Sequence, residues 1–177
     1  MDEKLPIIYL SGVLILLGGV AIFLIREIIK SRRTEGKLSR LQQQIKQGKA
    51  TAKEYYELGS LYLDKKLFSQ AVTLLQKALK LGGDIESENK ALIYNALGYA
   101  YFAQEQYELA IRNYKDAIKL YPEYAIAFNN LGNVYERKQM GSKALETYEA
   151  TLKFAPNNNV AKRRAESLRK RFQEVKN

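Results

Sequence analysis

The chain of 177 residues contains no cysteine, no histidine and no tryptophan, whereas 13 of its residues are tyrosines. The absence of cysteine excludes disulfide bonds, thiolate zinc sites, iron–sulfur clusters and a cysteine nucleophile. The absence of histidine excludes a Ser-His-Asp triad, imidazole metal ligands and the usual general base near neutral pH. The remaining residues contain no phosphate-binding loop and no paired catalytic carboxylates, so we expect no enzymatic activity, no cofactor and no metal.

Charge is missing from one long stretch near the N-terminus: residues 5–25 form an uncharged, apolar run of 21 residues. A helix of this length, rising about 1.5 Å per residue, matches a hydrocarbon core of roughly 30 Å. A cleaved signal peptide is the alternative, but its apolar region is usually only about 7–15 residues long. Asp2 and Glu3 precede the run, and no small-residue cleavage site follows it. We therefore predict a retained single transmembrane helix.

Basic residues follow the apolar run and predict its orientation. Residues 26–53 contain nine basic and two acidic side chains, and the basic side chains nearest the run are Arg26, Lys30, Arg32 and Arg33. Because positively charged flanks stay on the cytoplasmic side, we expect the body of the chain on the cytoplasmic or stromal side of the membrane. Anionic lipid headgroups are the expected partner of these four side chains, at about 1 kcal/mol for each basic residue near the surface.

An internal repeat organises the middle of the chain. The segment YNALGYAY, which begins at Tyr94, corresponds to FNNLGNVY, which begins at Phe128, with an offset of 34 residues, and a third copy begins at Tyr55. This period, with Leu, Gly, Tyr, Ala and Pro at fixed positions, resembles the tetratricopeptide repeat (TPR), a helix–turn–helix unit of about 34 residues. The resemblance covers residues 52–85, 91–124 and 125–158. It implies an all-α fold in which three repeats form a right-handed superhelical solenoid.

Each repeat has a glycine in the middle of its first helix, where glycine costs about 1 kcal/mol relative to alanine. We interpret these glycines as sites of close approach by the second helix, and we expect small residues at the matching positions there. The glycines are Gly59, Gly98 and Gly132, and the expected small residues are Ala71, Ala110 and Ala144. Between the first two repeats the offset rises to 39 residues. The surplus, about residues 86–90, either lengthens the connection or adds a turn to the next helix.

Further helical segments are expected on both sides of the repeats. Residues 26–51 predict a basic linker helix beside the membrane, because apolar residues recur there at helical spacing. Residues 159–177 predict a capping helix over the last repeat, with an apolar stripe of Val160, Ala161, Ala165, Leu168, Phe172 and Val175. The same segment carries the basic residues Lys162, Arg163, Arg164, Arg169, Lys170 and Arg171. These basic residues either form the solvated face of the cap or dock to lipid or to an acidic protein face.

The TPR resemblance also implies where a partner binds. In TPR arrays the second, fifth, sixth, ninth, twelfth and thirteenth positions of each repeat line a concave groove. Here the groove candidates are Tyr56, Ser60, Leu63, Asn95, Tyr99, Phe102, Asn129, Asn130 and Asn133. Asparagine can both donate to and accept from an extended peptide backbone, and the two aromatic residues of the second repeat would supply apolar anchorage. The basic clamp with which some TPR domains grip acidic chaperone tails is missing, because its positions hold Tyr56, Ser60, Ala96, Ile126 and Asn130.

The whole architecture resembles a small family of thylakoid TPR proteins from cyanobacteria and red-type plastids. That resemblance implies a membrane-anchored, non-enzymatic scaffold that assists assembly or stability of photosystem I. Its protein partner would be a photosystem I subunit or an assembly factor. Two alternatives stay open: a TPR receptor for protein import or envelope quality control, and a regulatory subunit of a membrane enzyme complex. Nucleic acid is not an expected partner, since the sequence contains no recognised nucleic-acid-binding module.

Overall fold

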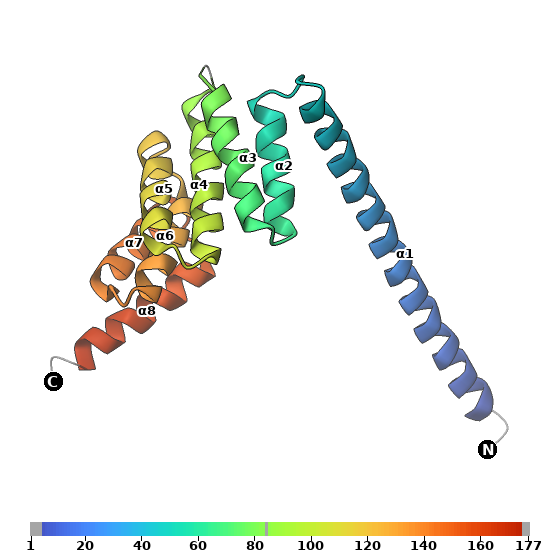
Figure 1. Cartoon of the computed structure of the whole chain (residues 1–177). Coiled ribbons are helices and arrows are strands. Elements are labelled where there is room, and N and C mark those ends of the chain that lie inside the picture. Colours follow the sequence, from blue (N-terminus) through green and yellow to red (C-terminus); the bar gives the residue numbers. More distant parts are fainter. Residues whose placement is uncertain (1–4, 84, 175–177) are drawn as a thin grey trace. The chain divides into compact units, whose positions relative to one another are not determined.

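The computed structural model describes residues 5–83 and 85–174, and the regular structure in this part of the chain is entirely helical (Figure 1). The helices are α1 (Leu5–Lys46), α2 (Ala52–Asp64), α3 (Phe68–Leu81), α4 (Ser87–Ala103), α5 (Tyr107–Leu120), α6 (Ala125–Arg137), α7 (Gly141–Phe154) and α8 (Asn159–Glu174). The chain divides into two compact units, Met1–Gln43 and Gln44–Asn177. The all-α fold class is confirmed. The expected acidic leader, Asp2 and Glu3, and the end of the expected capping segment, residues 175–177, lie outside the described residues.

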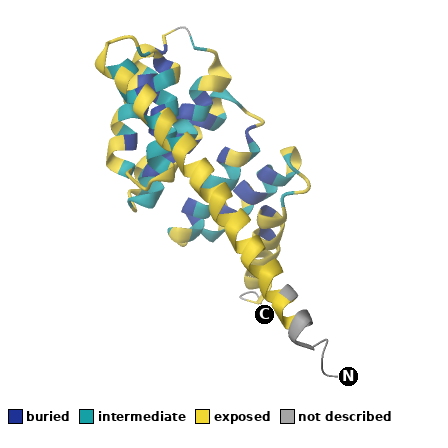
Figure 2. Cartoon of the chain, turned by 90° about the vertical axis from the view of Figure 1, so that its right-hand side faces the viewer, coloured by how far each residue is buried: buried dark blue, intermediate teal, exposed yellow. Residues whose placement is uncertain are grey.

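The first unit is built from one long helix. α1 continues for 42 residues, so the linker helix expected within residues 26–51 is a continuation of the apolar run and not a separate element. From Tyr9 to Ile29 its large hydrophobic side chains are exposed, and Figure 2 shows a long yellow stretch of this helix. Among the described residues, this is the one helix long and apolar enough to cross a membrane, judged by length and composition.

The second unit consists of helical hairpins. α2 pairs with α3, α4 with α5 and α6 with α7, and α8 packs against α7 (Figure 1). The first helices of successive repeats also contact one another, α2 with α4 and α4 with α6. Within the described part of the chain, contact between successive second helices is weaker than this or absent. α2, α4 and α6 therefore lie side by side along one face of the unit, which we call the inner face.

The mid-helix glycines bring the two helices of each hairpin close together. A Cβ atom added to Gly98 would lie 2.6 Å from Cε1 of Tyr114, and one added to Gly132 would lie 2.8 Å from Cε1 of Tyr148. Such distances are too short for real carbon atoms, so a side chain at either position would collide with the ring. Both rings are almost completely buried and have little room to move away.

The close approach predicted from the sequence is present, but the residues opposite the glycines differ from the expectation. We expected Ala71, Ala110 and Ala144 there, but the nearest atoms belong to Leu75, Tyr114 and Tyr148. At Gly59 the carbonyl oxygen of Ala71 follows, at 3.6 Å from an added Cβ. The three alanines are nevertheless fully buried. Each glycine thus makes room for a large side chain, which contributes more buried apolar surface than an alanine would.

The two helices of each repeat are joined by the same kind of turn. Lys66, Glu105 and Gln139 follow the first helices of the three repeats and have φ angles of 59°, 59° and 58°. For a residue with a Cβ atom, this left-handed conformation costs roughly 1–2 kcal/mol. The conformation recurs without glycine, so packing of the flanking helices imposes it on each repeat.

The surplus residues between the first two repeats add a turn to a helix. α4 has 17 residues, whereas α2 and α6 have 13 each, and the additional residues are at the start of α4. The Lys90 ammonium donates a hydrogen bond of 3.1 Å to the carbonyl oxygen of Gly83, which ties the lengthened helix to the preceding loop. Of the two alternatives that the sequence left open, the added turn is the one observed.

α8 buries a narrower stripe than the sequence predicts. Ala161, Ala165 and Leu168 are buried, as expected for a helix that covers the last repeat. Val160 was expected in the same stripe, and this was wrong: its side chain is 47% exposed. Neighbouring residues of a helix point about 100° apart, and burial of Ala161 turns Val160 away from α7. Phe172, another residue expected in the stripe, is 36% exposed and is therefore not fully buried either.

The glycine contacts lead to a test of stability. Replacing Gly98 with Ala should lower the free energy of unfolding by about 1–2 kcal/mol, since the collision with Tyr114 exceeds the gain in helix propensity. Urea denaturation of the full-length protein in detergent, followed by circular dichroism, measures the change. Gly83→Ala is the matched control, because a Cβ at Gly83 meets no atom within 4 Å. Equal stability of the two variants would contradict this account of the hairpin interface.

Candidate functional site

The inner face brings together candidate residues from neighbouring repeats. Asn130 on α6 donates a hydrogen bond of 3.0 Å from its side-chain amide to the side-chain oxygen of Asn95 on α4. The two residues are 35 positions apart in the sequence, and their contact crosses from one repeat to the next. Asn129 and Asn133 are on the same helix as Asn130, and both are half-buried. The four asparagines therefore form a polar surface across α4 and α6.

Asn129 contains an unsatisfied acceptor. Its side-chain oxygen is buried and accepts no hydrogen bond from the described residues. A buried polar atom without a partner costs roughly 1–3 kcal/mol, and such groups are rare in folded proteins.

The two aromatic candidates of the second repeat differ in how far their rings are exposed to a binding partner. Tyr99 is 46% exposed, and its ring packs edge-on against Phe68 of α3, with ring centroids 6.2 Å apart. Phe102 is half-buried and packs against Tyr107, with ring centroids 6.0 Å apart. Tyr99 is thus the better placed of the two to offer an apolar surface to a partner.

The first-repeat candidates are partly engaged within the protein. The Ser60 hydroxyl donates to the backbone oxygen of Tyr56 at 2.9 Å, so one of its hydrogen bonds is already used. Leu63 and Tyr56 are half-buried against the core of the first two repeats. This end of the inner face offers fewer free polar groups than the asparagine surface does.

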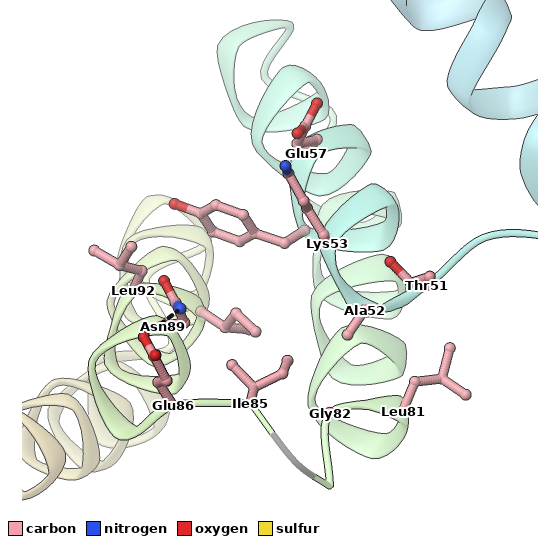
Figure 3. Close-up of a pocket in the computed structure, with 12 residues that line it drawn as sticks. Thr51, Ala52, Lys53, Glu57, Leu81, Gly82, Ile85, Glu86, Asn89 and Leu92 are labelled. Carbon is pink, nitrogen blue, oxygen red and sulfur yellow. Dashed lines mark hydrogen bonds between the residues drawn. The ribbon is translucent and has the colours of Figure 1, made fainter.

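A cavity of about 710 Å³ opens beside Tyr56 at the start of the repeats. Figure 3 shows Lys53 and Glu57 reaching it from α2, Asn89 and Leu92 from α4, and Ile85 between the two helices. Lys53, Leu92 and Glu57 occupy second and sixth positions of their repeats, so the repeat register could have identified them. Ile85 and Asn89 belong to the surplus segment, for which the repeat pattern offers no equivalent.

Charges near the cavity and on α6 are held by defined partners. The backbone N–H of Thr51 donates to the Glu54 carboxylate at 2.9 Å, and hydrogen bonds from Thr51 hold the pKa of Glu54 below its ordinary value. On α6 the Tyr148 hydroxyl donates to Glu136 at 2.7 Å. Burial, and then the bond to Glu136, raises the pKa of Tyr148, which therefore remains neutral at physiological pH. Glu136 also forms an ion pair of 3.6 Å with Arg164 of α8.

The basic candidates of the first unit lie on the exposed surface of α1. Arg26, Lys30 and Arg33 are spaced four and three residues apart and share one side of the helix. Arg32 is exposed on a different side. Within the described residues no group of acidic side chains is arranged to hold a metal ion.

Three consecutive helical hairpins, with their first helices aligned along an inner face, define a tetratricopeptide repeat protein. A family model described as TPR repeat matches residues 98–139, and one described as Tetratricopeptide repeat matches residues 52–81. The solved first TPR domain of Spaghetti (RPAP3), bound to an HSP90 peptide, has the same fold with a TM-score of 0.63 and 20% identity. That comparison covers 70% of this chain and 94% of the solved domain.

The chain belongs to the ycf37 family of TPR proteins. It is 42% identical over 127 residues to protein ycf37 of Cyanophora paradoxa. The matched region covers 72% of this chain and 73% of that protein. It is also 39% identical over 168 residues to the chloroplastic TPR domain-containing protein PYG7 of Arabidopsis thaliana. The latter similarity covers 93% of this chain but 55% of the Arabidopsis protein.

The unsatisfied acceptor on α6 can be tested by comparing Asn129 with Asn113, an asparagine whose side chain is hydrogen-bonded. Asn129→Ala removes an oxygen that has no partner, so the free energy of unfolding should stay unchanged or rise by up to about 1 kcal/mol. Asn113→Ala is the matched control, because its amide donates to the Leu109 oxygen at 2.8 Å, and its loss should cost about 1 kcal/mol. Urea denaturation of both full-length variants measures the difference. A larger loss for Asn129→Ala would show that its oxygen is satisfied in the free protein.

Proposed function

We propose that the chain is a membrane-tethered scaffold that assists assembly or stability of photosystem I at the thylakoid membrane. The TPR body would work on the stromal or cytoplasmic side, where it holds a segment of a photosystem I subunit or of an assembly factor. The family resemblance and the chloroplastic name of the Arabidopsis relative support this location and role.

The asparagine surface is the observation that carries the binding part of the proposal. An extended polypeptide needs donors and acceptors at regular intervals along its backbone, and side-chain amides provide both. The contact between Asn95 and Asn130 holds two such amides at the junction of neighbouring repeats. Tyr99, nearly half exposed beside them, adds the kind of aromatic anchor that often dominates binding energy.

The exposed apolar length of α1 supports the tether. From Tyr9 to Ile29 the helix offers large hydrophobic side chains on all sides, and a surface of that extent is unfavourable in water. A hydrocarbon core covers such a helix along its whole circumference, because every backbone polar group is bonded within the helix. Arg26, Lys30 and Arg33 then stand at the headgroup level, where anionic lipids attract them.

The tether can be tested in isolated thylakoids. The protein should remain in the membrane pellet after alkaline-carbonate extraction, and trypsin added to intact thylakoids should digest the TPR body from the stromal side. A variant with Leu14→Lys and Leu17→Lys should be released, because charges at the centre of a span cost about 2.5–3.5 kcal/mol each. Extraction of the unaltered protein, or protection of its TPR body from trypsin, would contradict the proposed topology.

Partner capture tests the inner face. Tyr99→Ala combined with Asn130→Ala should lower co-purification of photosystem I subunits from solubilised thylakoids by about tenfold or more, since interface tyrosines often contribute over 1 kcal/mol. Leu109→Ala with Asn157→Ala is the control, because it removes exposed groups outside the inner face. Circular dichroism should be alike for both. Capture that survives the first double change but not the second would place the binding surface elsewhere.

A further inference from the structure

α8 packs against α7 in the way that the first helix of a further repeat would, and it does more than cover the end of the third repeat. Its buried residues Ala161, Ala165 and Leu168 each lie 34 positions after a buried residue of α6, namely Ala127, Leu131 and Val134. α8 contacts α7 just as α6 contacts α5. The helix is therefore the first half of a fourth repeat, in the same register as α2, α4 and α6.

This register turns a basic surface toward the inner face. The residues of α8 that lie 34 positions after Ile126, Asn129, Asn130 and Asn133 are Val160, Arg163, Arg164 and Ser167. The placement of Arg164 supports the correspondence, because its guanidinium lies 3.6 Å from the Glu136 carboxylate on α6. The exposure of Val160, at 47%, matches that of Ile126, at 59%, and both side chains are free to contact a ligand.

The basic side chains of α8 are divided between two sides of the helix. Arg163, Arg164, Lys170 and Arg171 share the side that continues the inner face, with Glu174 as the acidic residue on it. Arg171 also lines a cavity of about 480 Å³ together with Leu168 and Phe172. On the other side, Arg169 is paired with Glu149 of α7 at 2.6 Å. Of the four basic residues on the side that continues the inner face, Arg164 alone has an ion-pair partner among the described residues.

We propose that α8 forms a fourth lining helix of the groove and binds an acidic stretch of the partner polypeptide. This inference rests on the proposed function, because it extends the same groove. The asparagine surface of α4 and α6 would hold the neighbouring backbone, and Ile126 with Val160 would hold an apolar side chain beside the acidic residues. A polypeptide fits better than a bilayer, because the basic residues are continuous with a surface of amides and single apolar side chains rather than a separate basic plane.

Site-specific photo-crosslinking of the full-length protein in native thylakoids tests this assignment. A photoreactive amino acid replaces Ser167, on the inner side of α8, or Lys162, on the other side. The expected product from position 167 is a polypeptide whose residues around the attachment point carry net negative charge. Position 162 should give little of that product.

Charge variants supply the quantitative part of the experiment. Arg163→Gln with Lys170→Gln should reduce the yield from position 167 about three- to tenfold, the effect of two partly exposed ion pairs. Lys115→Gln with Lys162→Gln removes the same amount of charge from other exposed sites and should leave the yield unchanged. Added salt should lower the yield of the unaltered protein more than that of the first variant.

The outcomes separate this inference from the proposed function. Attachment of position 167 to lipid or to a neutral or basic segment, or an unchanged yield in the Arg163 and Lys170 variant, would overturn the role of α8. A photoreactive residue at Tyr99 serves as the reference. If Tyr99 still attaches to a photosystem I subunit or assembly factor, the proposed function survives that failure. If neither position attaches to a polypeptide, both proposals are wrong.

Discussion

The contact of a mid-helix glycine with a large side chain of the paired helix is the interaction on which the second unit depends. Where Gly98 meets Tyr114, the two helices of a hairpin lie too close for even a methyl group. This spacing buries a whole ring between them and fixes how each hairpin stacks on the next. Because stacking brings α4 against α6, the amide contact between Asn95 and Asn130 follows from the same geometry.

Stability and recognition therefore reside in different parts of each repeat. The buried alanines and rings between the helices supply the apolar contact that holds the hairpins together. The inner face adds little to that core and contains features that are unfavourable in the free protein, such as the unbonded oxygen of Asn129. Residues that depart from the rules of stable packing are expected at functional sites.

The sequence predicts the repeat register well, because a 34-residue period fixes helix order, hairpin pairing and the inner positions together. It fails where several side chains compete for one space. The ring of Tyr114, and not the methyl group of Ala110, fills the space at Gly98, and no spacing rule separates these two neighbours on α5. Composition also could not decide whether the surplus segment is loop or helix. The structure adds a turn to α4 there and forms the cavity beside Ile85.

The repeat register explains where the basic residues of α8 lie, just as it explains where the asparagine surface lies. A terminal helix that only covered the last repeat would need one apolar side and could distribute its charges over the rest. Here the repeat register constrains those charges, and four basic residues occupy the side that adjoins Glu136 and the asparagines. Like charges so close together repel one another and disfavour the free protein. An acidic segment bound there would relieve this repulsion, and the neighbouring backbone of the same ligand would then lie along the asparagine surface of α4 and α6.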